Sequence, residues 1–146
     1  MKRFLRLVCL ALVLSLCLAM PCYADDTVEP RGSAFFASYG TALEKATSTS
    51  FKIWFDVDSN AAMMDVLGVS EIIVYRSADQ QSWTRVGTYD MDDYPEMIDT
   101  YAFSHTGYVT YYNAIPGYYY RAYVFFYAKD SRGVGERDVY TQILRM

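Results

Sequence analysis

Residues 115–128 read IPGYYYRAYVFFYA. Pro116 and Gly117 occupy the second and third positions of a tetrapeptide, an arrangement that is typical of a type II turn. Almost all the residues after the turn are aromatic, β-branched or small, which predicts one long strand over residues 118–128. Since the side chains of a strand alternate between its two faces, we expect one face of this strand to point into a core and the other to point outward.

Six further strands are expected on either side of this stretch, separated by turn residues at the spacing of a sandwich or barrel. The clearest is residues 51–57, in which Phe51, Ile53, Phe55 and Val57 share one face and more polar residues share the other. The expected strands besides residues 118–128 are Ala34–Tyr39, Phe51–Val57, Glu71–Arg76, Trp83–Tyr89, Tyr108–Tyr112 and Arg137–Leu144. No long amphipathic helix competes with them, so the sequence predicts an all-β fold, a single antiparallel β-sandwich of about seven strands.

Tyr120 is the candidate for a tyrosine corner, in which a Tyr early in a strand bonds back to the backbone of the preceding turn. Three adjacent tyrosines leave this assignment open by one residue. The run from Ile115 to Val124 resembles the corresponding part of a fibronectin type III or immunoglobulin-like sandwich, which implies two packed antiparallel sheets. The Cys, Trp, Cys spacing of true immunoglobulin domains is missing.

The chain also looks like a family of uncharacterised, small secreted proteins of Gram-positive bacteria. The residues that carry this likeness are 51–57, 64–68, 75–79 with Trp83, 105–111, and Gly117, Tyr120 and Ala122. They spread over nearly the whole chain beyond residue 24. That family has no assigned activity, so the likeness implies export and fold and adds nothing about chemistry.

Residues 1–24 have the pattern of a secretory signal peptide, with basic residues, then an apolar run over residues 7–20, then a cleavage site that ends at Ala24. The alternative is an uncleaved membrane anchor. However, that apolar run spans about 21 Å at helical rise, short of a hydrocarbon core of about 30 Å. We therefore expect a secreted, extracellular protein with no membrane association after cleavage. A flexible leader over residues 25–33 and a sandwich domain over residues 34–146 would follow.

Composition narrows the class of partner. Cys9, Cys17 and Cys22 all lie within the expected signal peptide, so the remaining chain cannot form a disulfide. The full chain of 146 residues carries a net charge of −4, and loss of the three basic residues in the signal leaves −7. Phosphate binding needs clustered Lys and Arg, so nucleic acid is not an expected partner.

Enzymatic chemistry has few candidate groups. His105 is the only His in the chain, no Cys follows residue 24, and no glycine-rich phosphate loop is present. Ser104 and Thr106 flank His105, but a catalytic triad depends on geometry in space and not on adjacency in sequence. We therefore expect no enzyme and no cofactor, and we assign no catalytic residue.

The acidic segment from Asp90 to Asp99 holds five carboxylates and no basic residue. Carboxylates in an extracellular loop suit calcium, but the Gly and Glu positions of an EF-hand are missing. We expect a solvated loop here, with calcium stabilisation as the less favoured alternative, and we assign no metal ligand. Residues 61–68 are expected to form one helical turn that Gly68 ends.

If Tyr120 faces the core, Tyr123, Phe125 and Tyr127 lie on the outer face of their sheet. In the sandwich register, we expect them to be joined there by Ile72, Val74, Tyr140 and Leu144. The residues expected to point inward are Ile73, Tyr75, Val139 and Ile143. Such an apolar patch on a small domain marks an interaction site. The alternatives are that the leader or the acidic segment covers half of these aromatics, or that Tyr is simply tolerated on the surface of β-strands.

A second, smaller aromatic set is Trp54 with Tyr108 and Tyr112 on the opposite sheet. Either set could stack on sugar rings or pack against a protein. The sequence thus predicts a noncovalent binding module for a cell-surface glycan or protein. The ligand-binding candidates are Tyr123, Phe125, Tyr127, Tyr140 and Trp54. The alternative is an extracellular structural protein that self-associates through its exposed sheet faces and edges.

Overall fold

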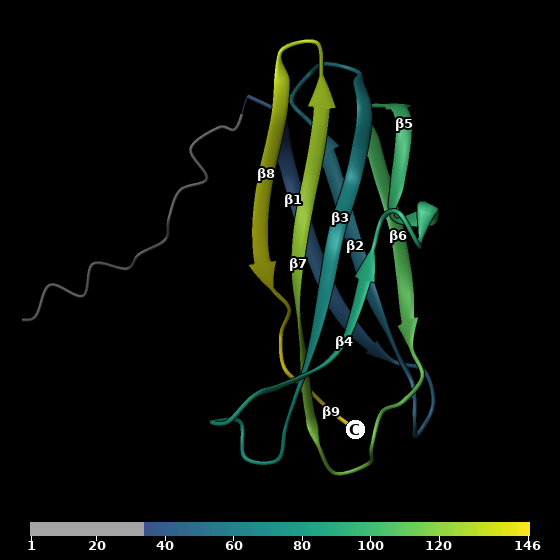
Figure 1. The fold of residues 1–146 in the computed structure, drawn as a ribbon, viewed down its shortest axis with the longest axis vertical. Coiled ribbons are helices and arrows are strands. Elements are labelled where there is room, and N and C mark those ends of the chain that lie inside the picture. Colours follow the sequence, from purple (N-terminus) through teal and green to yellow (C-terminus); the bar gives the residue numbers. More distant parts are fainter. Residues whose placement is uncertain (1–33) are drawn as a thin grey trace, which may run out of the picture. The chain divides into compact units, whose positions relative to one another are not determined.

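The computed structural model describes residues 34–146; the expected signal peptide and leader, residues 1–33, lie outside the described residues. The described part is all-β, as predicted, with nine strands and one short 3₁₀ helix (Figure 1). The elements are β1 (Phe36–Lys45), β2 (Phe51–Ser59), β3 (Met64–Ser77), β4 (Thr84–Asp90), η1 (Pro95–Met97), β5 (Ile98–Ala102), β6 (Ser104–Tyr111), β7 (Tyr119–Asp130), β8 (Gly133–Tyr140) and β9 (Leu144–Arg145).

The strands form two antiparallel sheets that pack face to face as a sandwich. The three-stranded sheet has the order β1-β2-β6, and the six-stranded sheet has the path β4-β3-β7-β8, with β5 paired to β3 and β9 paired to β7. Figure 1 shows β8, β7, β3 and β4 side by side in one layer. On one side of the sandwich, β4 is the edge strand of the six-stranded sheet and β6 is the edge strand of the three-stranded sheet.

The core lies between the sheets and follows the predicted alternation of β2 and β7. Phe51, Ile53 and Phe55 of β2 are buried, and so is every second residue of β7 from Tyr120 to Ala128. The rings of Phe51 and Tyr120 meet across the sandwich, with centroids 5.1 Å apart. Each fully buried aromatic or aliphatic side chain of this kind stabilises the fold by about 1.5–3 kcal/mol relative to an exposed one. Because the described residues hold no cysteine, this packing must carry the stability.

Tyr120 forms the predicted tyrosine corner. The backbone N–H of Ile115 donates a hydrogen bond to the Tyr120 hydroxyl over 2.8 Å. Gly117 has φ +87°, and the Tyr118 N–H donates to the Ile115 carbonyl, as a type II turn requires. The turn before β7 and the inward face of β7 are thus fixed by the same hydroxyl.

The helical turn predicted over residues 61–68 is wrong, because β3 begins at Met64 and continues through this segment. Gly68 does not end a helix; it lies inside the strand with φ +155°. A Cβ atom on Gly68 would lie 2.2 Å from the Met97 carbonyl oxygen, so the glycine allows the backbone after η1 to cross β3 closely.

The prediction of which β3 side chains point into the core is also wrong. Ile72 and Val74 are fully buried, whereas Ile73 and Tyr75 are partly exposed on the outer face. The pairing of β3 with β7 shifts by one residue between Val69 and Glu71, which is a β-bulge. A bulge reverses which residues face the core on its far side.

Several boundaries differ from the prediction, and β6 begins at Ser104 and not at Tyr108. Gly40 lies within β1, which extends to Lys45 and does not end near Tyr39. The acidic segment is not wholly a loop, because it contains η1 and the start of β5. The last predicted strand is divided into β8 and β9, and this break leaves Ile143 exposed and packs Leu144 against the core, the reverse of the expected facing. Val139 does pack against the core as expected.

Candidate functional site

The outer face of the six-stranded sheet carries a row of interlocked side chains, here called the aromatic ladder: Trp83, Arg121, Tyr140, Tyr123 and Phe125. Tyr123 of β7 pairs with Tyr140 of β8 in the sheet register, and their rings stack with centroids 4.3 Å apart and an interplanar angle of 22°. Phe125 contacts the Tyr123 ring edge to face, at 4.6 Å and 69°. The ladder therefore runs across two strands.

Arg121 lies between two rings of the ladder. Its guanidinium carbon is 4.2 Å from the centroid of Trp83 and 4.4 Å from that of Tyr140. The Arg121 Nε is buried and has no hydrogen-bond partner within residues 34–146. Contacts between a guanidinium and aromatic faces are favourable by about 0.5–2 kcal/mol, so they hold this side chain and both rings in place.

The Tyr123 hydroxyl donates a hydrogen bond to Oδ2 of Asp138 on β8. This bond, more than desolvation or the nearby charge, raises the pKa of Tyr123 to about 12. The hydroxyl is protonated at neutral pH even at the ordinary pKa, and the raised pKa extends its role as a donor to more alkaline pH. The hydrogen bond thus fixes the Tyr123 hydroxyl, in addition to the ring contacts that order the rest of the ladder.

The structure brings four of the five predicted site residues to this face. Tyr123, Phe125 and Tyr127 point outward from β7 and are partly exposed, and Tyr140 is 46% exposed. Tyr127 lies at the register position opposite Glu136 and not beside another ring of the ladder. η1, within the acidic segment, contacts β3, β5 and β6, and its Met97 is buried in the core and does not lie over the ladder.

Trp54 is the fifth predicted residue, and it lies on the other sheet. Its ring packs on Tyr108 of β6, with centroids 4.6 Å apart, as expected for neighbouring strands. Its Nε1 donates to Glu44 Oε2 over 2.6 Å. The Lys52 Nζ lies 4.2 Å from the Tyr108 centroid and 5.2 Å from that of Trp54. Tyr112, the third member of the predicted set, is 72% exposed and follows the end of β6.

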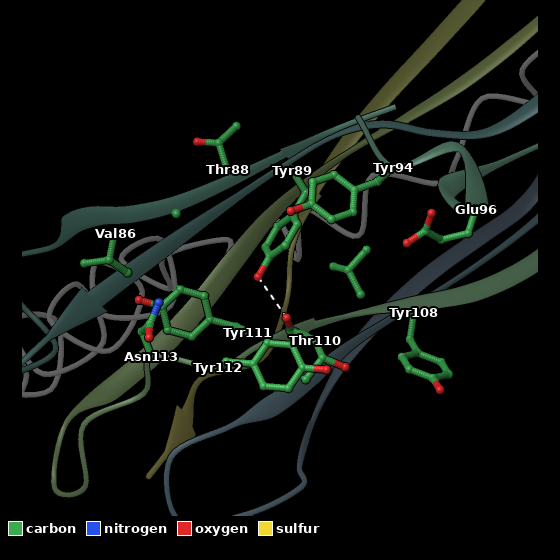
Figure 2. Close-up of a pocket in the computed structure, with 12 residues that line it drawn as sticks. Val86, Thr88, Tyr89, Tyr94, Glu96, Tyr108, Thr110, Tyr111, Tyr112 and Asn113 are labelled. Carbon is green, nitrogen blue, oxygen red and sulfur yellow. Dashed lines mark hydrogen bonds between the residues drawn. The ribbon is translucent and has the colours of Figure 1, made fainter. Parts of the chain in front are cut away.

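A groove with a volume of about 570 Å³, here called the edge groove, lies between β4 and β6 (Figure 2). The Tyr89 hydroxyl bridges it and donates to the Thr110 carbonyl over 3.0 Å. The Tyr94 ring packs against Tyr89 at 5.0 Å and 71°. The aromatic residues that line the groove are Tyr89, Tyr94, Tyr108, Tyr111 and Tyr112.

Desolvation, together with the neighbouring Tyr94, raises the pKa of Tyr89 to about 12. Its hydroxyl therefore remains a neutral hydrogen-bond donor to more alkaline pH than an ordinary tyrosine does. Figure 2 shows this hydroxyl pointing from β4 toward Thr110, with the Tyr94 ring beside it. The bridge ties the edges of the two sheets together at the floor of the groove.

Glu96 of η1 is the charged side chain among the described residues that line the edge groove. It also lines an adjoining hollow of about 470 Å³ with Trp54, Thr106 and Tyr108. Glu96 is exposed, and its carboxylate has no hydrogen bond or ion pair within the described part of the chain. The groove therefore combines tyrosine rings with a carboxylate that is available to a ligand.

The groove was not predicted as a site. Tyr108 and Tyr112 were recognised as a possible aromatic set, and Tyr89 and Tyr94 flank the acidic turn in the sequence. What makes them one site is the approach of two edge strands from different sheets. No local pattern in the sequence encodes that approach.

The carboxylates of the acidic segment do not gather into a metal site. Within residues 34–146, no group of three or more His, Cys, Asp or Glu side chains is close enough to hold a metal ion. The Asp90 Oδ1 instead accepts the backbone N–H of Asp92 over 2.9 Å and closes the turn after β4. His105 places its Nε2 at 3.1 Å from the Glu96 carbonyl oxygen and its ring against Phe55.

No protein-family model matches this chain, and no curated protein matches it. The described residues include no helix with the length and apolar character needed to cross a bilayer.

Proposed function

We propose that this chain is a secreted, noncovalent binding module that docks a protein through the aromatic ladder. The observation that carries the proposal is the stacking of Tyr140 between Tyr123 and the Arg121 guanidinium. These contacts order large side chains before any partner arrives. A partner then loses little side-chain entropy on this face, which favours tight docking.

The way the rings lie favours a protein over a glycan. A sugar ring stacks on an open aromatic face. Two groups cannot occupy one face of a ring, so Tyr123 and Arg121 cover opposite faces of Tyr140. The exposed part of Tyr140 is therefore its edge with the hydroxyl. Ring edges and tyrosine hydroxyls suit the mixed apolar and polar surface of a protein partner.

Secretion and the finer fold class belong to the same proposal. The signal-like pattern of residues 1–24 supports export. The bond from Ile115 N–H to the Tyr120 hydroxyl supports an immunoglobulin or fibronectin type III-like sandwich, because both use such a corner. The likeness to small secreted proteins of Gram-positive bacteria stays a prediction of the sequence.

The experiment measures binding of residues 25–146 to the surface of Gram-positive cells. The cells are treated beforehand with protease, or with periodate to oxidise glycans. We expect protease treatment to abolish binding and periodate to leave it unchanged. Phe125→Glu should abolish binding because it places a charge within the ladder, whereas Trp54→Ala, on the opposite sheet, should not.

Self-association is the second candidate function. β8 is an edge strand of the six-stranded sheet, and its Val134 and Tyr140 are 50% and 46% exposed. Sedimentation over a range of concentrations separates the two candidates. A dimer that Phe125→Glu dissociates supports self-association, whereas a monomer at high concentration supports a foreign protein partner. Binding that is sensitive to periodate, or lost only with Trp54→Ala, contradicts the ladder as the docking face.

A further inference from the structure

The β6 strand has a free edge beside the edge groove. Within residues 34–146, β6 pairs with β2 alone, and Thr110 directs its carbonyl away from β2 toward Tyr89. In an antiparallel strand, the N–H and C=O of one residue point the same way, and alternate residues point to the same edge. The backbone groups of Thr106 and Tyr108 therefore also point into the groove side, where a further strand would pair with them.

The side chains around this free edge are suited to a cation. Glu96 supplies a carboxylate, and the tyrosine rings supply faces that attract positive charge. Lys52 Nζ already lies 4.2 Å from the Tyr108 centroid on the outer face of the sheet, so Tyr94 is the ring that a further cation would meet with Glu96.

We propose that the edge groove binds an extended peptide segment that carries a lysine or arginine. The segment adds to β6 as a further antiparallel or parallel strand, and its backbone bonds the free groups of Thr106 and Tyr108. Its cationic side chain pairs with Glu96 and packs against Tyr94, which lines the groove with it. Strand addition supplies affinity through main-chain bonds, and the pocket for the side chain supplies specificity. This site is separate from the aromatic ladder and does not depend on it.

The test uses a labelled peptide of alternating threonine and lysine as the probe, with binding followed by fluorescence anisotropy. Two matched peptides accompany it: one with glutamate in place of lysine, and one with N-methylated backbone amides. We expect the lysine peptide to bind and the glutamate peptide not to bind. N-methylation should weaken binding about tenfold or more, since it removes several main-chain hydrogen bonds.

Glu96→Gln should weaken binding of the lysine peptide about fivefold, the effect of losing one exposed ion pair. Glu136→Gln is the matched control, because Glu136 is also exposed but lies on β8, at the far edge of the other sheet. Hydrogen exchange gives the second measurement. The amides of Thr106 and Tyr108 should become protected on binding, while those of Gly107 and Val109, which face β2, should stay as they were.

Several outcomes would overturn the proposal. Equal weakening by Glu96→Gln and Glu136→Gln would mean that the peptide senses only the net negative charge of the protein. Unchanged affinity after N-methylation, or no new protection at Thr106 and Tyr108, would rule out strand addition. Loss of binding with Phe125→Glu but not with Glu96→Gln would place the peptide on the ladder, and no binding of the lysine peptide at millimolar concentration would refute the site.

Discussion

The hydroxyl of Tyr89 on β4 donates a hydrogen bond to the carbonyl of Thr110 on β6, across 3.0 Å and between two different sheets. Apolar packing makes up most of the contact between the sheets, and the Gln142 side chain, between β8 and β9, donates a further hydrogen bond to the Leu43 carbonyl of β1 over 3.1 Å. At the β4 and β6 edge, this directional bond from Tyr89 joins the two sheets across the edge groove. The bond also occupies a carbonyl of β6 that would otherwise be free at the edge.

Tyr89→Phe should therefore lower the free energy of unfolding by about 1 kcal/mol, the usual net value of one hydrogen bond. The ring still packs on Tyr94, so the loss reports the hydroxyl alone. Urea denaturation followed by fluorescence measures it. Tyr112→Phe is the matched control, because Tyr112 is 72% exposed; an equal loss in both variants would show that the bridge contributes nothing.

Tyr120→Phe should lower the free energy of unfolding by about 1–3 kcal/mol. The variant leaves the Ile115 N–H, which now bonds the Tyr120 hydroxyl over 2.8 Å, without its partner. Tyr119→Phe, one residue away and on the outer face, should change it by less than about 0.5 kcal/mol. The reverse order of the two losses would move the tyrosine corner to the neighbouring residue.

Gly68→Ala should destabilise the fold more than Gly133→Ala, although both glycines have positive φ, at +155° and +135°. A Cβ at Gly68 would lie 2.2 Å from the Met97 carbonyl oxygen, whereas nothing lies within 4 Å of a Cβ at Gly133. We expect about 1–2 kcal/mol at Gly133 from backbone strain alone. At Gly68 we expect about 3 kcal/mol or more. Thermal unfolding of the two variants, side by side, makes the comparison.

Alkaline pH should destabilise the protein through two tyrosines. The pKa of Tyr123 is raised to about 12 by its bond to Asp138, and that of Tyr89 is raised to about 12 by desolvation. The ordinary value, which applies to the unfolded chain, is 10.0. Below pH 10 the stabilisation from the raised values is fully present, and it is lost as the pH rises through about 12, because the unfolded chain releases these protons first.

The absorbance of tyrosinate, measured as the pH is raised, assigns these shifts. In Asp138→Asn, the titration of Tyr123 should move toward the ordinary pKa, while that of Tyr89 should not move. If the difference between the wild-type and variant titrations is flat up to pH 12, the hydrogen bond to Asp138 does not control the pKa of Tyr123.

The sequence predicts facing well where polar and apolar residues alternate or where a special contact marks one face. In β2 the alternation from Phe51 to Val57 is sufficient, and in β7 the corner at Tyr120 sets the inward face. In β3 neither signal is present, because residues 72–75 are all apolar or aromatic. The bulge near Ser70 also changes which alternate residues point into the core. The facing there depends on pairing with β7, which is a long-range property.

The candidate surfaces also differ in how much of them can be predicted from local alternation and how much depends on long-range contacts. Tyr123, Phe125, Tyr127 and Tyr140 could be grouped from alternation along two strands. The role of Arg121 between Trp83 and Tyr140 could not, since Trp83 comes from a distant turn. β5 was missed because its residues follow directly on an acidic segment that has the composition of a loop. The edge groove depends on two strands from different sheets and needed the three-dimensional structure.

The bulge in β3 also constrains how the length of this chain can change. The two halves of β3 are out of phase, with Leu67 and Val69 inward before the bulge and Ile72 and Val74 inward after it. Deleting the single residue Ser70 would bring the halves into step and turn the far half over. A variant shortened there would expose aliphatic residues beneath the rings of the ladder, so loss of one codon at this position would alter the protein more than most substitutions.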